Sequence, residues 1–76
     1  MFTHKDLELI YFYLLQSRYE LRQTHNNCLT AIAIAKAQQN VSEDWIEYMN
    51  QHIDLLSEKI DSLNELISKV EKELNN

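Results

Sequence analysis

The chain has 76 residues, with 12 acidic and seven basic side chains, a formal net charge of −5, and neither glycine nor proline. A length of this order corresponds to a single domain, residues 1–76, that buries only about 60% of the surface of its unfolded chain, so association with a partner is a natural way to complete the core. The lack of glycine excludes the glycine loops that bind phosphates and dinucleotides, and the acidic balance argues against direct contact with nucleic acid.

The single cysteine limits the chemistry of the chain. Cys28 has no second cysteine with which to form an internal disulfide, which favours a reducing, cytoplasmic setting. His25 lies three residues before it, but two ligands without a third do not make a metal site. We therefore expect no metal and no cofactor.

Targeting segments are also not expected. The densest apolar run, residues 9–15, is far shorter than the ~18 to 20 residues that span a bilayer. The charged and polar residues that follow it do not fit the layout of a signal peptide. We therefore expect no contact with a membrane.

A first helix is predicted over residues 4–39. Thr3 and Asp6 have the spacing of a capping box at its start. A seam of apolar or small residues recurs every seven positions, at Leu7, Leu14, Leu21, Cys28 and Ala35. Residues 24–27 have poor helix propensity, and a break near Asn26 would give three helices in all. We favour one unbroken helix because the seven-residue spacing keeps its phase across this polar patch.

A second helix is predicted over residues 43–75, with Ser42 as its N-cap. Its apolar residues step by three and four without an error over four heptads. They are Ile46, Met49, Ile53, Leu56, Ile60, Leu63, Ile67, Val70 and Leu74. A seam of this length indicates packing against another helix. Because the connection 40–42 is short, we expect an all-α fold, a long antiparallel helical hairpin.

Folding about this connection also predicts which residues meet. Cys28 should lie near Ile53, so that a small side chain of the first helix faces a large one of the second. Ion pairs across the interface are expected as well: Arg22 with Glu58 or Asp61, and Arg18 with Glu65. Exposed pairs of this kind contribute only ~0 to 1 kcal/mol each.

Both helices carry apolar and aromatic residues beside the seam. These candidate self-association or partner-binding residues are Phe12, Leu15 and Tyr19 in the first helix, and Trp45, Tyr48, His52 and Leu55 in the second. Aromatic side chains are enriched at interfaces, and an apolar patch on a small protein marks a contact site. Two hairpins that pair as a homodimeric four-helix bundle would bury both sets. A face reserved for a different protein is the alternative, and the two can coexist.

Acidic residues form a second candidate surface on the outer side of the second helix. They are Glu47, Asp54, Glu58, Asp61 and Glu65. Charged outer positions are the normal solvated surface of a coiled coil. A row of carboxylates is also suited to imitate nucleic acid and to block a DNA-binding or RNA-binding protein, as anti-defence proteins do.

Two resemblances add functional hypotheses. The segment Ser57, Glu58, Lys59, Ile60, Asp61, Ser62 and Leu63 resembles the Ser-x-x-Leu-Asp-x-Leu signature of the helical-hairpin aspartyl-phosphate phosphatases of the sporulation phosphorelay, with Ile60 in place of the usual leucine. That resemblance implies a signalling protein with Asp61 as its functional acid. Segment 2–10, followed by a helix, a short turn and a second helix that ends with 67–74, resembles the short helical proteins of bacteriophages and their Gram-positive hosts over most of the chain. This second resemblance implies a small regulator or inhibitor that binds a host protein.

The hypothesis that the sequence favours is a non-enzymatic protein-interaction module, a homodimeric regulator or inhibitor of another protein. The acidic mimic and the phosphatase-like signalling protein are the alternatives.

Overall fold

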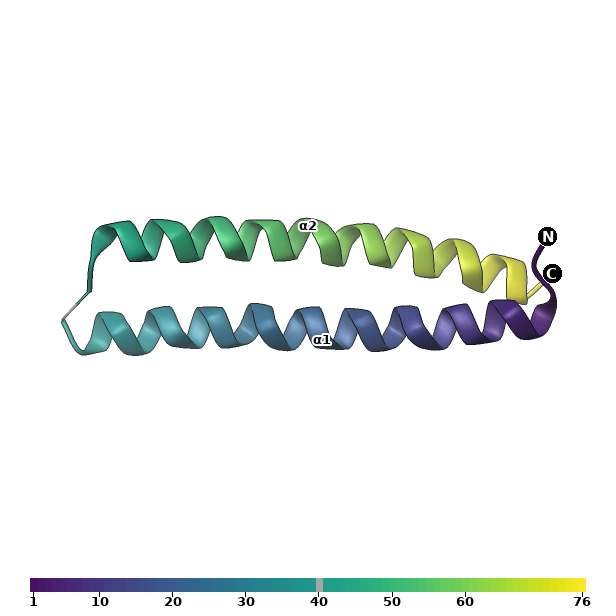
Figure 1. The fold of residues 1–76 in the computed structure, drawn as a ribbon, viewed down its shortest axis with the longest axis horizontal. Coiled ribbons are helices and arrows are strands. Elements are labelled where there is room, and N and C mark those ends of the chain that lie inside the picture. Colours follow the sequence, from purple (N-terminus) through teal and green to yellow (C-terminus); the bar gives the residue numbers. More distant parts are fainter. Residues whose placement is uncertain (40) are drawn as a thin grey trace.

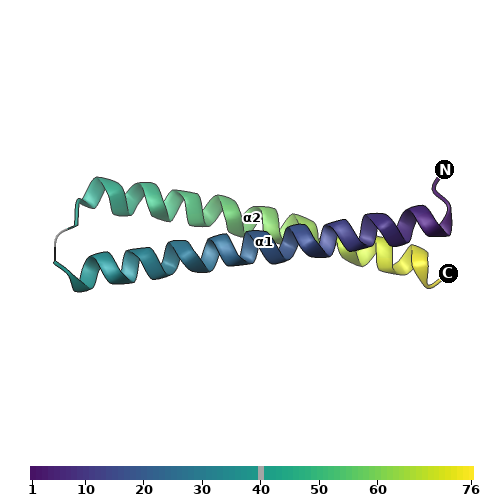
Figure 2. The same cartoon turned by 60° about the horizontal axis from the view of Figure 1, so that its bottom comes forward.

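The computed structural model describes residues 1–39 and 41–76, and these form two helices, α1 (His4–Ala37) and α2 (Glu43–Leu74). The helices lie side by side and antiparallel, with both termini at the end opposite the connection (Figure 1). In the turned view α1 crosses over α2 toward the termini, so the two helices wrap around each other (Figure 2). The prediction of an all-α helical hairpin is confirmed.

The hairpin is a rod and not a globule. Its principal dimensions are 54 × 15 × 15 Å, and its radius of gyration is 17.1 Å. A compact domain of this length would have a radius of gyration of about 11 Å. The rod therefore exposes far more surface than a compact domain of the same length.

The two ends of α1 follow from specific residues. At the start, the backbone N–H of Thr3 donates to Oδ2 of Asp6 at 2.9 Å and the N–H of Asp6 donates to Oγ1 of Thr3 at 3.1 Å, which is the predicted capping box. At the other end, Gln39 adopts φ 56°, the left-handed conformation that ends many helices and that glycine takes at the lowest cost. A glutamine takes this position in a chain without glycine, so α1 ends at Ala37 and not at residue 39 as predicted.

The polar patch at residues 24–27 does not interrupt α1. The hydroxyl of Thr24 donates to the carbonyl oxygen of Glu20 at 3.1 Å, one turn earlier. The hydroxyl therefore bonds within the helix and does not favour a non-helical backbone. Cys28, directly after the patch, is buried in the interface with α2. The unbroken helix is therefore confirmed, and the alternative of a break near Asn26 is wrong.

The second helix begins as predicted, with the side chain of Ser42 accepting from the N–H of Trp45 at 3.4 Å. Asn40, which the sequence places in the connection, lies outside the described residues. Neither of the two described helices combines the length and the hydrophobicity that crossing a bilayer requires.

The core is a single line of side chains between the helices. The buried residues are Cys28, Ile32, Ile53, Leu56, Ile67 and Val70. Cys28 and Ile53 belong to one cluster, as the register predicts, and Leu21 and Met49 pack against it. Ile67 is the most deeply buried of the described side chains, at 2% exposed. If one core side chain is truncated, few buried neighbours are therefore present to replace its contacts.

The predicted ion pairs are not present. Among residues 1–39 and 41–76, the acid–base contact within 4.0 Å joins Nε2 of His4 to Oε1 of Glu8, one turn apart on α1. Arg18 instead donates from Nη1 to Oδ1 of Asn64 at 2.9 Å, the residue before the expected Glu65. The expectation of pairs from Arg22 and Arg18 to acids of α2 is therefore wrong. Arg22 and Asp61 line the same pocket but form no ion pair within 4.0 Å, and Arg18 bonds to Asn64.

Truncating the deepest core residue tests this architecture. We expect Ile67→Ala to lower the free energy of unfolding by about 2–5 kcal/mol, because it removes apolar contacts and leaves a cavity. Urea unfolding followed by circular dichroism measures the change. The matched control is Leu9→Ala, at a side chain that is 57% exposed, where we expect a change within about 0.5 kcal/mol. Equal losses in the two variants would contradict a core centred on Ile67.

Candidate functional site

Two hydrogen bonds between the helices set their register. One joins Arg18 to Asn64, as described above, and the other joins Oγ of Ser57 to Nε2 of His25 at 3.2 Å. The pairs are 46 and 32 residues apart in the chain, and both are centred on Val41. Residues equally distant from Val41 therefore lie level with each other along the rod.

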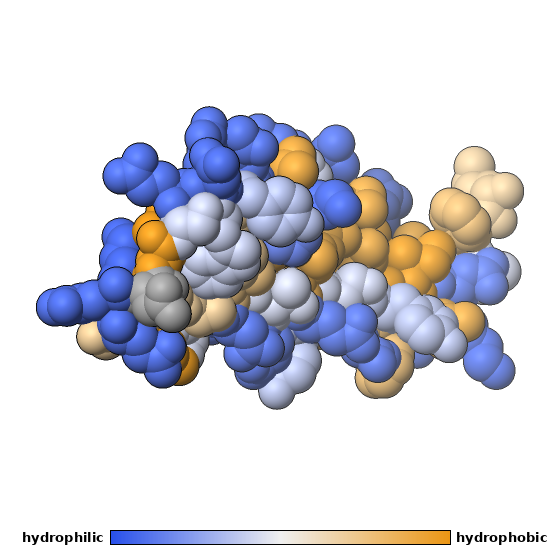
Figure 3. Space-filling view, turned by 60° about the vertical axis from the view of Figure 1, so that its left-hand side comes forward, coloured by the Kyte–Doolittle hydropathy of each residue, from blue (hydrophilic) through white to orange (hydrophobic). Residues whose placement is uncertain are grey.

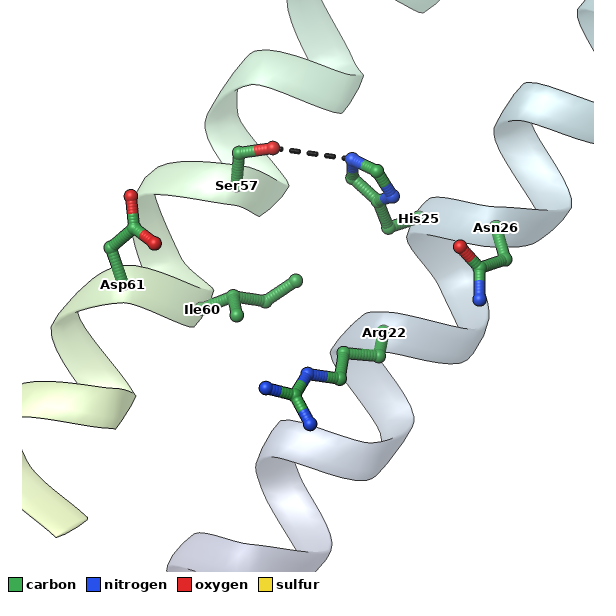
Figure 4. Close-up of a pocket in the computed structure, with 6 residues that line it drawn as sticks. All are labelled: Arg22, His25, Asn26, Ser57, Ile60 and Asp61. Carbon is green, nitrogen blue, oxygen red and sulfur yellow. Dashed lines mark hydrogen bonds between the residues drawn. The ribbon is translucent and has the colours of Figure 1, made fainter.

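One side of the hairpin carries a pocket of about 350 Å³. Its lining comes from both helices and comprises Arg22, His25, Asn26, Ser57, Ile60 and Asp61. Figure 4 shows His25 reaching from α1 to Ser57 on α2, with the side chain of Arg22 directed into the space between the helices. We call this side of the hairpin the charged face.

The other side carries a larger and more apolar pocket of about 540 Å³. Its lining comprises Ser17, Leu21, Glu58, Lys59, Ser62, Leu63 and Leu66. Asp61 and Lys59 flank Ile60 in the sequence, so they lie about 100° to either side of it around α2. The two pockets are therefore on opposite sides of the seam, and we call the second side the apolar face.

The candidate residues of α2 lie on the apolar face. Trp45, Tyr48, His52 and Leu55 continue by steps of three and four to Lys59, Ser62 and Leu66, which line its pocket. Tyr48 and Leu55 are 64% and 55% exposed, and the rings of Tyr48 and His52 are parallel to within 3°. Figure 3 views this side obliquely from the turn and shows a band of hydrophobic side chains along the rod, bordered by hydrophilic ones.

The candidate residues of α1 lie on the opposite side. Phe12, Leu15 and Tyr19 continue by steps of three and four to Arg22 and Asn26, which line the pocket of the charged face. Phe12 and Tyr19 are more than 60% exposed, whereas Leu15 is half-buried. One face-to-face contact between two hairpins therefore covers one of the two predicted sets, and not both as the sequence suggested.

Sequence reasoning missed part of the apolar face on α1. A row of residues spaced by three and four runs through the pocket residue Ser17, and its members are Tyr13, Ser17, Glu20, Thr24, Asn27, Ala31 and Ile34. Tyr13 and Ile34 are 60% and 54% exposed. The helical period from Tyr13 gives this row in the sequence. Only the register of the packed helices shows that the row lies on the same side as Trp45.

The five candidate acids are all exposed, but they do not form one surface. Asp61 lines the pocket of the charged face, whereas Glu58 lines the pocket of the apolar face. Glu47 and Asp54 precede Asp61 at seven-residue intervals and share its side of α2. Glu65 follows Glu58 on the outer side. The acidic surface is thus broad and wraps around the exposed half of α2.

The pair of Ser57 and His25 is a further feature that the sequence did not reveal. A catalytic triad would need a carboxylate on the second ring nitrogen of the histidine. Asp61 lies on α2 one turn beyond Ser57, and Figure 4 shows it on the far side of Ser57 from that nitrogen. In the described ranges, no three His, Cys, Asp or Glu side chains are grouped as a metal site requires. The geometry is that of a half-buried polar contact between helices.

Comparisons with models of protein families, with curated proteins and with solved structures find no match to the chain.

A double-mutant cycle tests the hydrogen bond that sets the register. We expect Arg18→Ala and Asn64→Ala to be coupled by about 0.5–1.5 kcal/mol in the free energy of unfolding, because either change alone removes the same bond. Urea unfolding of the two single variants and the double variant gives the coupling. The matched control pairs Arg22→Ala with Asn64→Ala, for which we expect additivity. Additivity in both cycles would show that the bond to Arg18 does not contribute to stability.

Proposed function

We propose that the protein is a non-enzymatic protein-interaction module of the cytoplasm, a homodimer that regulates or inhibits another protein. The observation that carries this proposal is the apolar face. Its rows span residues 13–34 of α1 and 45–66 of α2, and exposed side chains on them include Tyr13, Ile34, Tyr48, Leu55 and Leu66. The α1 row is polar between its ends, at Ser17, Glu20, Thr24 and Asn27, so the exposed apolar and aromatic side chains lie mainly on α2 and at the two ends of the α1 row. Such side chains gathered on one side of a small protein mark a site of association.

The surface area supports association with a second copy. The hairpin exposes 6070 Å², whereas a compact monomer of its mass would expose about 4,900 Å². Two hairpins would have to bury about 4,000 Å² in total for their combined accessible surface area to equal that of a compact protein of twice the mass. This value lies within the 2,000–5,000 Å² typical of obligate homodimers. Pairing would therefore supply the second layer of core that one hairpin does not have.

The charge distribution supports the choice of face. Interface cores are poor in charged residues. The α1 row of the apolar face contains one charged residue, Glu20, and the α2 row from Trp45 to Leu66 contains one, Lys59. The pockets of the two faces are each lined by two charged residues, but the rows of the charged face contain four, which are Arg22 on α1 and Glu47, Asp54 and Asp61 on α2. Burial of the apolar face between two copies leaves the charged face, with Phe12 and Tyr19, for the protein that is regulated.

The exposed carboxylates favour a second candidate function. Glu47, Asp54 and Asp61 share one side of α2, and no Lys or Arg of residues 1–39 and 41–76 pairs with them within 4.0 Å. An unneutralised row of this kind would suit the basic groove of a nucleic-acid-binding protein. Binding of this type should weaken steeply with salt, whereas an apolar contact through Phe12 and Tyr19 should not.

The mass in solution tests the proposal. Light scattering of the parent chain should give twice its 9.1 kDa, and Leu55→Glu should give the mass of one chain, because a carboxylate buried without a partner opposes association. The matched control is Tyr19→Glu on the charged face, which should keep the dimer mass. Circular dichroism checks that each variant stays helical.

Three outcomes would count against this proposal. A parent chain of 9.1 kDa over the whole dilution series would contradict self-association. Dissociation by Tyr19→Glu with none by Leu55→Glu would assign the contact to the other face. Loss of an aspartyl-phosphate phosphatase activity in Asp61→Asn, with helicity and mass unchanged, would favour the enzymatic alternative.

A further inference from the structure

The apolar face carries three charged residues: Glu20 and Lys59 belong to its rows, and Glu58 lines its pocket beside Lys59. Glu20 lies three residues from Ser17 on α1, and Lys59 lines the same pocket as Ser17 from α2. In the register centred on Val41, Ser62 is level with Glu20, and Lys59 is three residues nearer the turn. Three residues of helix correspond to about 4.5 Å along the axis.

Two symmetric ways exist to stack two hairpins by this face. With the turns at the same end, the two-fold axis runs along the rod, and α1 of each copy lies on α2 of the other. With the turns at opposite ends, the axis is perpendicular to the rod, and each helix lies on its own counterpart. Both arrangements cover the same apolar side chains, so the hydrophobic effect alone does not choose between them.

Charge does distinguish them. With the turns at the same end, Glu20 comes within one helical turn of the partner's Lys59, and the symmetry repeats this contact. With the turns at opposite ends, full overlap superimposes the middles of the two α1 helices. The middle of α1 (His4–Ala37) is at Glu20 and Leu21, so Glu20 would meet the partner's Glu20. Like charges that face each other destabilise such a contact.

We infer that a second copy of this chain packs on the apolar face with its turn at the same end, and that Glu20 and the partner's Lys59 select this arrangement. The inference rests on the proposed self-association. It leaves the two charged faces on opposite outer sides of the dimer, so the dimer presents two equivalent surfaces to the protein that it regulates.

A charge-exchange cycle tests the selection. Glu20→Lys and Lys59→Glu should each raise the dissociation constant of the dimer about tenfold, because each replaces two attractive contacts by two repulsive ones. The double variant should return to within about threefold of the parent chain. Sedimentation equilibrium at low salt measures the constants. Both residues are exposed in the hairpin, so circular dichroism should show unchanged helicity. If the double variant recovers nothing, the paired contact does not exist.

Distances between labels give an independent readout. Glu43→Cys places a spin label at the first residue of α2, beside the turn. With the turns together, the two labels are separated by no more than the width of two hairpins, each 15 Å thick. With the turns apart, their separation approaches the 54 Å length of the rod. Cys28 is buried and is replaced by alanine in both copies, with dimer mass as the check on that background.

The outcomes separate this inference from the proposal beneath it. A chain that is a monomer at every concentration overturns both. A dimer with label separations near the rod length, or without recovery in the double variant, overturns the arrangement and leaves the self-association in place.

Discussion

The contact between α1 and α2 along one line of side chains supports the rest of the structure. Small residues of α1 such as Cys28 face large ones of α2 such as Ile53, which lets two long helices approach closely over most of their length. This line is the whole of the core in the described chain, since both flanks of each helix are open to solvent. The geometry of any external contact therefore depends on how the two helices are set against each other.

Polar side chains at the edge of this line limit how the helices can be set. The bonds from Arg18 to Asn64 and between His25 and Ser57 both require the register centred on Val41. Sliding one helix by seven residues, about two turns, would leave apolar residues facing apolar residues, because the seam repeats every seven positions. It would also separate both polar pairs. Polar groups at seam positions are a known means of fixing register in coiled coils, at some cost in stability. The hairpin has two such polar pairs: the pair of His25 and Ser57 lies about midway along the rod, and the pair of Arg18 and Asn64 lies closer to the termini.

Fixing the register gives the rod two unlike sides. The flanks of α1 and α2 that adjoin each other across the seam become one surface, so Ser17 and Lys59 share the apolar face while Arg22 and Asp61 share the charged face. A protein of this size would otherwise have little means to present two distinct surfaces. Under the proposed function, one face would contact a second copy and the other face a different protein.

The sequence by itself determined the local structure. The seven-residue seam, the capping box of Thr3 and Asp6 and the N-cap at Ser42 specify two long helices and a short turn, because each acts within one or two helical turns of the chain. The end of α1 was misplaced by two residues, since no glycine marks the left-handed position that Gln39 takes.

Tertiary structure alone decided which residues beside the seam share a face. Whether Phe12 and Trp45 share a face depends on which side of the seam each residue lies on after the two helices have packed. From the sequence we expected one pairing of hairpins to bury both sets, whereas the packed hairpin places them on opposite sides. The packing of the helices also decides that Arg18 bonds to Asn64 and not to Glu65. Adjacent residues on a helix point about 100° apart, so only the packed structure shows which of the two faces the other helix.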